Sequence, residues 1–405
     1  MADNDVNGNG AGELTKDPFA DFDHLTAVCL TEDPAPILRE MRETCPVGRA
    51  ETHGGSWVLT RYEDIYDVTR DPETYCSGQG VNVPSHGMPP LPPIESDPPI
   101  HALFRGPLIS RFSPGRIAEH EPHAREVVTG LVDAFIESGE ADLAQQLTVP
   151  LPAVVNTPIL GIPSEDRAKF QDWAVRLLSS AGGDQEAIQA TAGYFGELYG
   201  MRTSEPTGDI PTLMTEVEID GERISPDMFV LAMIMLMSAG LDTTTNAGSH
   251  ILHWLGEHPE ERRLLTEDPS RIPTAIEELL RRSTPLPTLF RTATRDVTLH
   301  GQVIPAGDRV QLSWMAANHD PDEFPEPESV QLDRKPNRHF AFGVGAHRCL
   351  GAAMARMELK VLLEESLPRL GDYKVTATPT RYVGVTRGIQ NLPVTFTPGA
   401  RIGGR

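Results

Sequence analysis

The stretch HFAFGVGAHRCLG, residues 339–351, places Cys349 next to a glycine-rich loop and directly before an apolar segment. Gly343 and Gly345 allow tight turns whose backbone N–H groups can point at one side chain. The segment that follows has the composition of a helix, and a helix N-terminus carries a partial positive charge that favours a thiolate. The pattern therefore predicts a loop and a helix that together hold one sulfur atom in a defined place.

Four uses of Cys349 compete: a disulfide, a buried apolar thiol, a zinc ligand and a haem ligand. The cysteines at positions 29, 45, 76 and 349 form no Cys-x-x-Cys pair, and their scatter favours reduced thiols over a disulfide framework. His347 and Cys349 lack a second pair at the spacing of a zinc site. A haem thiolate fits the loop, because Phe342 offers an aromatic wall and Gly351 lets the backbone approach a flat ring. A structural buried cysteine stays open at this point.

The composition is that of an acidic globular protein. The chain has 405 residues, with 58 acidic against 35 basic side chains, and a formal net charge of −23. This charge argues against nucleic acid or an anionic membrane as the main partner. No uninterrupted apolar run reaches the ~20 residues of a membrane span, and the polar N-terminus does not resemble a signal peptide. We expect a cytoplasmic protein with a disordered tail over residues 1–16 and a single domain over 17–405.

Helical patterns dominate the chain. We predict helices at 36–45 and 61–71, a long helix at 226–257, and further helices at 259–268, 272–283 and 351–368. Strand patterns occur at 56–61, 288–301 and 309–317, and again over the last thirty or so residues. The proline-rich segment 76–99 reads as a long loop of the kind that tends to be functional. The fold class is therefore mainly α with a small β component, α+β.

The long predicted helix contains an unusual stretch, SAGLDTTTNA, residues 238–247. Glycine costs a helix about 1 kcal/mol, yet Ala239 and Gly240 together would leave room for something flat or small. Thr243 can bond the carbonyl one turn back, and Asp242 can relay protons. Taken alone, the stretch is also consistent with an ordinary polar helix face.

Two further candidate features are pairs of charged or imidazole side chains at helical spacing. Glu278 and Arg281 are three residues apart on one predicted helical face, where an ion pair can form, and Arg334 could join them in a buried cluster. His101 and Arg105 lie four apart at a predicted helix start, a spacing suited to carboxylates. Separately, each pattern is typical of a solvated surface or an ordinary helical turn.

In this order and spacing the four features resemble the cytochrome P450 family, and its soluble bacterial branch that includes camphor hydroxylase. The similarity covers nearly the whole chain, residues 33–394. It implies the cytochrome P450 fold, with a long central helix over the haem and the cysteine loop beneath it. It also implies a b-type haem with the Cys349 thiolate as axial iron ligand, O2 as co-substrate, and monooxygenase activity.

The resemblance assigns roles to individual residues. Asp242 and Thr243 match the catalytic acid–alcohol pair, while Glu278 and Arg281 match a structural ion pair that we extend to Arg334. The expected haem-binding residues are His101, Arg105, Ala239, Gly240, Arg291, His339, Phe342, Gly343, His347, Cys349 and Gly351. The side chains matched to the haem propionates are His101, Arg105, Arg291 and His339. The expected substrate pocket comprises Val83, Met235, Ser238, Leu286, Pro287, Leu289, Val385 and Thr386.

The expected reaction is the insertion of one oxygen atom into an apolar small molecule, by hydroxylation, O-dealkylation or epoxidation. A terpenoid, an aromatic compound or a secondary-metabolite intermediate would fit. The chain contains no flavin-type or ferredoxin-type pattern, so electrons from NAD(P)H would arrive through a separate ferredoxin and ferredoxin reductase, docking near Arg105, Arg348 and Arg356 on a monomer. A peroxide-dependent haem-thiolate enzyme and a non-catalytic haem sensor or carrier remain alternatives. An intact Asp242–Thr243 pair argues against both.

Overall fold

The structure is a computed structural model that describes residues 17–87, 89–179, 184–382 and 384–403. Residues 1–16, for which we expect a disordered tail, lie outside this range. The α-helices are α1 (Ala35–Thr44), α2 (Tyr62–Arg70), α3 (Ile100–Ile109), α4 (Pro114–Ala118), α5 (Glu121–Phe135), α6 (Pro150–Ile159), α7 (Arg167–Ser179), α8 (Gln185–Ser204), α9 (Ile210–Thr215), α10 (Pro226–Glu257), α11 (Pro259–Glu267), α12 (Ile272–Ser283), α13 (Trp314–Asn318) and α14 (Ala352–Ser366).

Shorter helical turns and strands connect these helices. The turns are η1 (Leu25–Leu30), η2 (Thr52–Gly54), η3 (Ala144–Thr148) and η4 (Pro269–Arg271). The strands are β1 (Val47–Ala50), β2 (Ser56–Leu59), β3 (Tyr75–Cys76), β4 (Glu140–Asp142), β5 (Glu218–Ile219), β6 (Glu222–Arg223), β7 (Thr288–Ala293), β8 (Val297–Leu299), β9 (Gln302–Ile304), β10 (Arg309–Ser313), β11 (Lys374–Val375), β12 (Arg381–Tyr382), β13 (Gly388–Ile389) and β14 (Pro393–Thr395). The predicted mainly helical α+β class is confirmed.

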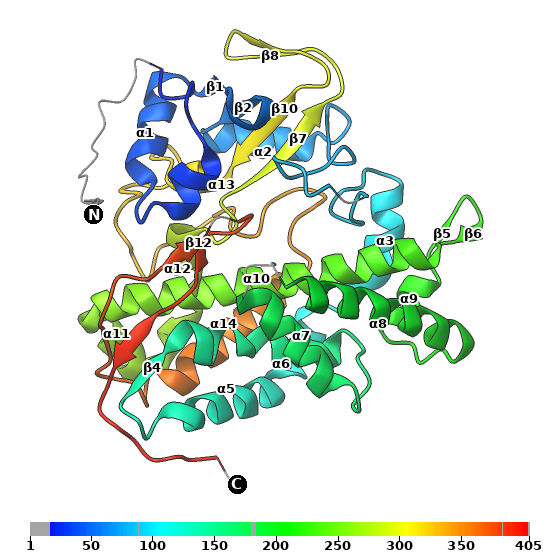
Figure 1. Ribbon diagram of the computed structural model, residues 1–405. Helices are drawn as coiled ribbons and strands as arrows, with labels where there is room; N and C mark the ends of the chain where they lie inside the picture. Colours follow the sequence, from blue (N-terminus) through cyan, green and yellow to red (C-terminus); the bar gives the residue numbers. More distant parts are fainter. Residues whose placement is uncertain (1–16, 88, 180–183, 383, 404–405) are drawn as a thin grey trace, which may run out of the picture.

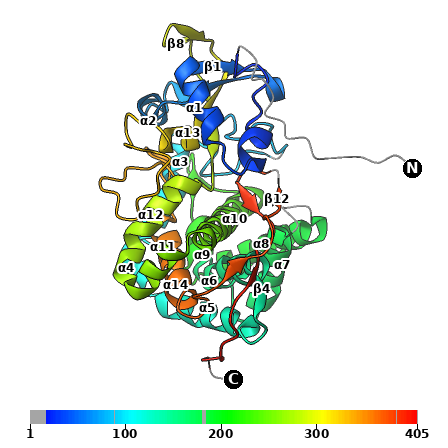
Figure 2. The ribbon, with the colours of Figure 1, turned by 90° about the vertical axis from the view of Figure 1, so that its left-hand side faces the viewer.

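Helix α10 is the central element and has the predicted bounds. It starts where the Ser225 hydroxyl accepts a hydrogen bond from the Met228 N–H at 3.2 Å, with Pro226 in the first helical position. It ends before Pro259, which begins the next helix. Figure 1 shows α10 crossing the middle of the molecule, and Figure 2 views it nearly end-on. The helix packs against α6, α8, α12 and α14, and it also lines the cavity described below.

The largest sheet lies on one side of α10, away from α5 and α14 (Figures 1 and 2). Its strand order is β1-β2-β10-β7-β3, and only the β10–β2 pair is parallel within it. Val310 and Leu312 of β10 are fully buried, as expected for the middle strand of a sheet. The predicted strand 309–317 is wrong in its second half: the chain leaves the sheet at Ser313, whose hydroxyl caps α13 by accepting from the Ala316 N–H at 3.3 Å.

One described helix, α10, is long and apolar enough to cross a membrane, judged by length and composition alone. It lies in the centre of the fold, surrounded by other helices. Core helices of globular proteins often share these properties, so this is weak evidence for a membrane segment.

Candidate active site

A cavity of about 240 Å³ is bounded by α10 and by the chain around Cys349. A single water molecule needs only about 10–15 Å³ on the same measure, so the cavity has room for a large group. Its other walls come from the 76–99 loop, α3, α6, the segment 285–291 and α14. Segments from most of the chain therefore meet at this cavity.

The loop before α14 presents Cys349 to the cavity. The Cys349 N–H donates to the Phe342 carbonyl at 2.8 Å, which closes the loop on itself. Gly343 and Gly345 both have positive φ, at 61° and 75°, and a Cβ on Gly345 would lie 2.7 Å from the Thr69 carbonyl oxygen. These positions therefore need glycine for the turn and for the close approach.

The Cys349 thiol is accessible, but the surface it exposes faces the cavity. Burial among the surrounding protein raises the pKa of the thiol, while the Gly351 N–H and the charges of nearby arginines oppose that rise. All four cysteines are free thiols, so a disulfide is excluded in this structure. Among the described residues, Cys349 belongs to no group of three metal-ligating side chains, so a protein-only zinc site has no support either.

A rim of cationic and imidazole side chains borders the same cavity. It consists of His101, Arg105, Arg291 and His347. Arg291 is almost fully buried and burial lowers its pKa to about 10; its guanidinium donates to the Phe290 carbonyl at 2.8 Å. The pKa of His347 falls to about 3, first through burial and then through the positive charges around it.

No carboxylate forms an ion pair with this rim among the described residues, although the charge of Asp97 acts on His101 and Arg291. His101 Nε2 is buried without a hydrogen-bond partner among the described residues. The one carboxylate among the described lining residues is Glu358, whose pKa burial raises well above its ordinary value. A buried cation is costly unless paired. A flat cofactor with carboxylate groups, such as haem, would supply the missing partners, so the residues present fit the predicted group.

His339 lies apart from the other residues of the predicted haem site. Its side chain is buried outside the cavity lining, and its Nε2 lies 3.2 Å from the Glu277 carboxylate. Arg356 also binds this carboxylate through two hydrogen bonds, at 2.7 and 2.6 Å. His339 is therefore held away from the cavity by α12 and α14 in this conformation. All the other predicted haem residues, His347 among them, line the cavity.

Helix α10 contributes a hydroxyl and two small residues to the cavity. Ala239, Gly240 and Thr243 line it, and the Thr243 hydroxyl donates to the Ala239 carbonyl at 2.7 Å. The Gly240 carbonyl accepts from the Asn156 Nδ2 at 3.0 Å. Asn156 also lines the cavity, and its buried Oδ1 has no partner among the described residues. Asn156 lies in an apolar stretch of α6, and nothing local in the sequence marks its contact with α10.

Asp242 lies outside the cavity lining, in a polar network with the C-terminal strands. One carboxylate oxygen accepts from the Tyr382 hydroxyl at 2.8 Å and from the Asn246 amide at 2.9 Å. The other accepts from the Thr386 hydroxyl. The Asn246 oxygen in turn accepts from the Ile389 N–H at 3.2 Å. The acid that the sequence places beside Thr243 is therefore turned towards β12 and β13 in this conformation.

Part of the predicted substrate pocket lines this cavity. Met235, Leu286 and Leu289 line the cavity. The residues that do not line it are Val83, Ser238, Pro287, Val385 and Thr386. Ser238 bonds its own helix, through the Met235 carbonyl, and Val385 is half exposed on the surface. The lining residues that the sequence interpretation missed include Phe112 and Leu236.

Glu358 is a further residue that the interpretation missed. It lies on α14, nine residues after Cys349, and both carboxylate oxygens are buried without a partner among the described residues. Met354 and Leu362, one turn before and after it, are buried too. An acid on an otherwise apolar helical face was the available signal, because such residues are rarely buried without a function or a partner.

The predicted charged cluster forms in the protein interior. Arg281 binds Glu278 through two hydrogen bonds, at 2.8 and 2.9 Å, and neither side chain is exposed. The Arg334 Nε lies 3.0 Å from both oxygens of the same carboxylate. Arg281 also donates to the carbonyls of residues 318, 327 and 329. The cluster therefore ties α12 to the irregular segment that leads into the Cys349 loop.

Comparison with known proteins agrees with this arrangement. The family model for cytochrome P450 matches residues 201–371. The steroid C26-monooxygenase of Mycobacterium tuberculosis (strain ATCC 25618 / H37Rv) is 33% identical over 378 residues, which cover 90% of this chain and 94% of the relative. The mycinamicin IV hydroxylase/epoxidase of Micromonospora griseorubida is 36% identical over 402 residues, covering 94% and 98%.

A solved structure gives the same result for the fold. Cytochrome P450 CYP109Q5 from Chondromyces apiculatus superposes with a TM-score of 0.83 at 30% identity, over 94% of this chain and all of that one. The predicted fold and the predicted monooxygenase class are thus confirmed. With sequence similarity along nine-tenths of its length and a cysteine loop facing the central helix across one cavity, this chain belongs to the cytochrome P450 family.

Proposed function

We propose that this chain inserts one oxygen atom of O2 into a large alicyclic or macrocyclic molecule that is mostly apolar. One observation carries the proposal: the Cys349 sulfur and the Thr243 hydroxyl line one cavity whose other walls are largely apolar. Pockets of this kind hold their ligands through apolar contact and orient them with a few polar groups. Hydroxylation and epoxidation both fit this arrangement.

The cofactor role follows from the family and from the rim of the cavity. When bound, haem activates O2 for insertion into the substrate. Cys349 would hold the iron, and His101, Arg105, Arg291 and His347 would hold the carboxylates of the ring. Phe342 and Gly351 line the cavity close to Cys349 in the chain and would exclude water from the sulfur.

Thr243 and Asp242 would handle protons in this proposal. Thr243 holds its hydroxyl proton towards the Ala239 carbonyl, which leaves the oxygen's lone pairs available to the cavity. Asp242 connects to the Thr386 and Tyr382 hydroxyls on its other side. We infer that these hydroxyls relay protons to Asp242, each regaining a proton as it gives one, and that Asp242 passes them to Thr243 after its side chain turns, or through a water molecule.

The choice of substrate class rests on the cavity wall and on the relatives. Outside the rim that fits the cofactor, the cavity lining contains no arginine or lysine among the described residues, so a carboxylate substrate has no partner there. The relatives include enzymes named steroid C26-monooxygenase, mycinamicin IV hydroxylase/epoxidase and vitamin D(3) 25-hydroxylase. All three names refer to large molecules rather than to small aromatic compounds, which supports the larger class here.

Electron supply from NAD(P)H through a ferredoxin and its reductase is part of the proposal, as are a cytoplasmic location and a monomeric state. The expected docking arginines differ in availability. Arg356 binds the Glu277 carboxylate, and Arg105 lines the cavity and donates to the Arg348 carbonyl. Arg348 is exposed, so it is the best placed of the three to meet an acidic partner.

The first experiment tests the thiolate. Haem-loaded protein, reduced and treated with CO, is expected to show the absorption band that thiolate ligation produces. Cys349→Ala is expected to lose that band, whereas Cys76→Ala, a buried cysteine away from the cavity lining, keeps it. A band that survives in Cys349→Ala would place the iron on another residue. A panel of steroids and macrolides is then screened for displacement of the iron-bound water, and hits are tested for product.

A second candidate function is peroxide-driven oxidation. The observation in its favour is that Asp242 is turned away from the cavity, so proton delivery needs a rearrangement. Product formation is compared with a ferredoxin, its reductase and NAD(P)H in one assay, and with hydrogen peroxide alone in another. Turnover that is efficient only with peroxide would favour this second function over the first.

A further inference from the structure

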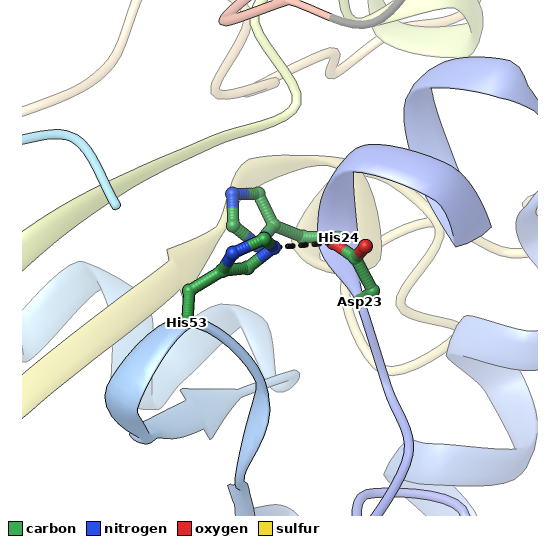
Figure 3. Close-up of side chains that lie close together, drawn as sticks. All are labelled: Asp23, His24 and His53. Carbon is green, nitrogen blue, oxygen red and sulfur yellow. Dashed lines mark hydrogen bonds and ion pairs between the residues drawn. The ribbon is translucent and has the colours of Figure 1, made fainter. Parts of the chain in front are cut away.

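A cluster of metal-ligating side chains lies near the N-terminal end of the described chain, outside the cavity. Asp23 and His24 precede η1, and His53 lies in η2, between β1 and β2. Figure 3 shows the two imidazoles and the carboxylate gathered in one place. Each offers one ligand atom, and these atoms all lie within 4.8 Å of one another. We propose that the three side chains bind one divalent transition-metal ion.

The Asp23 carboxylate and the His53 ring are already in contact. His53 Nε2 lies 2.9 Å from Asp23 Oδ1, and the Leu25 N–H donates to the same oxygen at 2.9 Å. These contacts hold the carboxylate and the imidazole together, and a metal ion can replace the hydrogen bond between them.

His24 supplies the third donor. Its ring is buried, and it packs edge-on against Phe290 at 5.2 Å and against the His53 ring at 5.7 Å between centroids. These contacts hold the His24 imidazole beside the other two donors.

The turn that carries His53 is held in an unfavourable backbone conformation. His53 has φ 52° and ψ 32°, a left-handed conformation that residues with side chains seldom adopt. The neighbouring Thr52 hydroxyl donates to the Phe22 carbonyl at 2.7 Å, which fastens this turn to the segment that carries Asp23 and His24. Backbone strain of this kind persists where surrounding contacts demand it, and here those contacts keep His53 beside the other two donors.

The donor set selects the class of ion. Two imidazoles and one carboxylate suit zinc and its first-row neighbours, whereas magnesium and calcium prefer oxygen donors alone. Three protein ligands leave a fourth position for water. The ion would link residues 23–24 to the β1–β2 turn and, through Phe290, to the 76–99 loop, because the His24 ring packs on Phe290 and the Phe290 N–H donates to the Val81 carbonyl at 2.9 Å. Because Pro93 and Ile94 of that loop line the cavity, the metal would stabilise one wall of the active site.

Equilibrium dialysis of chelator-stripped, haem-loaded protein against zinc chloride tests the proposal, with zinc and haem iron measured by elemental analysis. One zinc per haem is expected in excess magnesium. Asp23→Asn and His53→Gln alter partly exposed side chains, and each is expected to weaken zinc binding at least about 100-fold. Loss of a residue that only hydrogen-bonds a metal ligand already lowers metal affinity by about 10–100-fold. His300→Gln is the matched control: His300 also has a positive φ, at 50°, and its Nε2 lies 2.9 Å from Asp64, with no third ligand.

Full zinc stoichiometry in His53→Gln would place the ion elsewhere, for example at Glu32, His253 and Glu257, and would overturn the proposal. An equal loss in His300→Gln, or no uptake by the parent, would overturn it as well. Hydrogen exchange gives a readout independent of activity. Zinc is expected to slow amide exchange at residues 81–83 in the parent and not in His53→Gln, and equal exchange in both would refute the link to the loop.

Discussion

Removal of the Glu278 carboxylate is expected to destabilise the protein severely. The carboxylate accepts four hydrogen bonds from the guanidinium groups of Arg281 and Arg334. It also accepts from the Gln331 N–H at 2.9 Å and the Asn337 amide at 3.1 Å. Glu278→Ala leaves two arginine side chains, both almost fully buried, with no counter-charge.

The size of the effect follows from this burial. Stranding one partner of a buried ion pair costs about 3–5 kcal/mol, and a folded protein is typically stable by only about 5–15 kcal/mol. The variant should therefore lose at least about a fifth of its free energy of unfolding. Arg281 also holds the carbonyls of residues 318, 327 and 329, so the segment leading to Cys349 loosens and haem content falls.

Urea unfolding of the haem-loaded protein, followed by circular dichroism, measures the loss, and haem absorbance per chain measures retention. Glu278→Gln is expected to resemble Glu278→Ala, because the amide restores shape without charge and turns an N–H towards a guanidinium. A free energy of unfolding within about 1 kcal/mol of the parent, with full haem content, would refute the reasoning. It would mean that the cluster's desolvation cost cancels its attraction.

Glu277 provides the matched control, one residue earlier on α12. It pairs with Arg356, which is partly exposed, so Glu277→Gln is expected to cost less than Glu278→Ala. Burial opposes ionisation of Glu277, but hydrogen bonds from Arg356 and His339 outweigh it and hold its pKa at about 2 instead of 4.5. A depressed carboxyl pKa stabilises the fold above the unfolded value, and this stability is lost as the pH falls towards 2. The difference between parent and Glu277→Gln should therefore be constant from pH 7 to 5 and shrink below pH 4.5. A difference that grows on acidification would contradict this sign.

Thr243→Ala is expected to release more hydrogen peroxide and less product per NAD(P)H than the parent. Thr245→Ala, whose hydroxyl bonds a backbone carbonyl outside the cavity, should keep the parent's ratio of product to peroxide. Equal ratios in the parent and both variants would mean that the proton site is misplaced. Tyr382→Phe removes a hydrogen bond to Asp242 of a kind worth about 1.5–3 kcal/mol. Turnover should therefore slow several-fold and show a larger solvent deuterium isotope effect, with substrate binding unchanged. An unaltered isotope effect would argue against this network. Arg348→Glu should slow reduction by ferredoxin in stopped-flow mixing and reduce its sensitivity to salt, and reduction at the parent's rate would exclude Arg348 from the docking surface.

Local sequence patterns were sufficient for the helices that build the site. The Ser225–Pro226 start and the Pro259 stop predict the bounds of α10, because capping and proline chemistry act over a few residues. The glycines at 343 and 345 likewise predict a turn that only glycine permits, and the structure gives both a positive φ. Apolar periodicity likewise predicts helix α12, whereas the three-residue spacing of Glu278 and Arg281 alone is also typical of a solvated face.

The direction of individual side chains was decided by tertiary structure. His339 and His347 belong to the same loop, yet His339 turns to Glu277 and His347 to the cavity, because α12 and α14 place an acid beside only one of them. Asp242 finds its partners at Tyr382 and Thr386, about 140 residues further along the chain. The sequence by itself determined the elements and the chemistry they carry, since both depend on neighbouring residues. Which groups face the cavity depends on contacts between segments far apart in the chain, and no local pattern encodes those contacts.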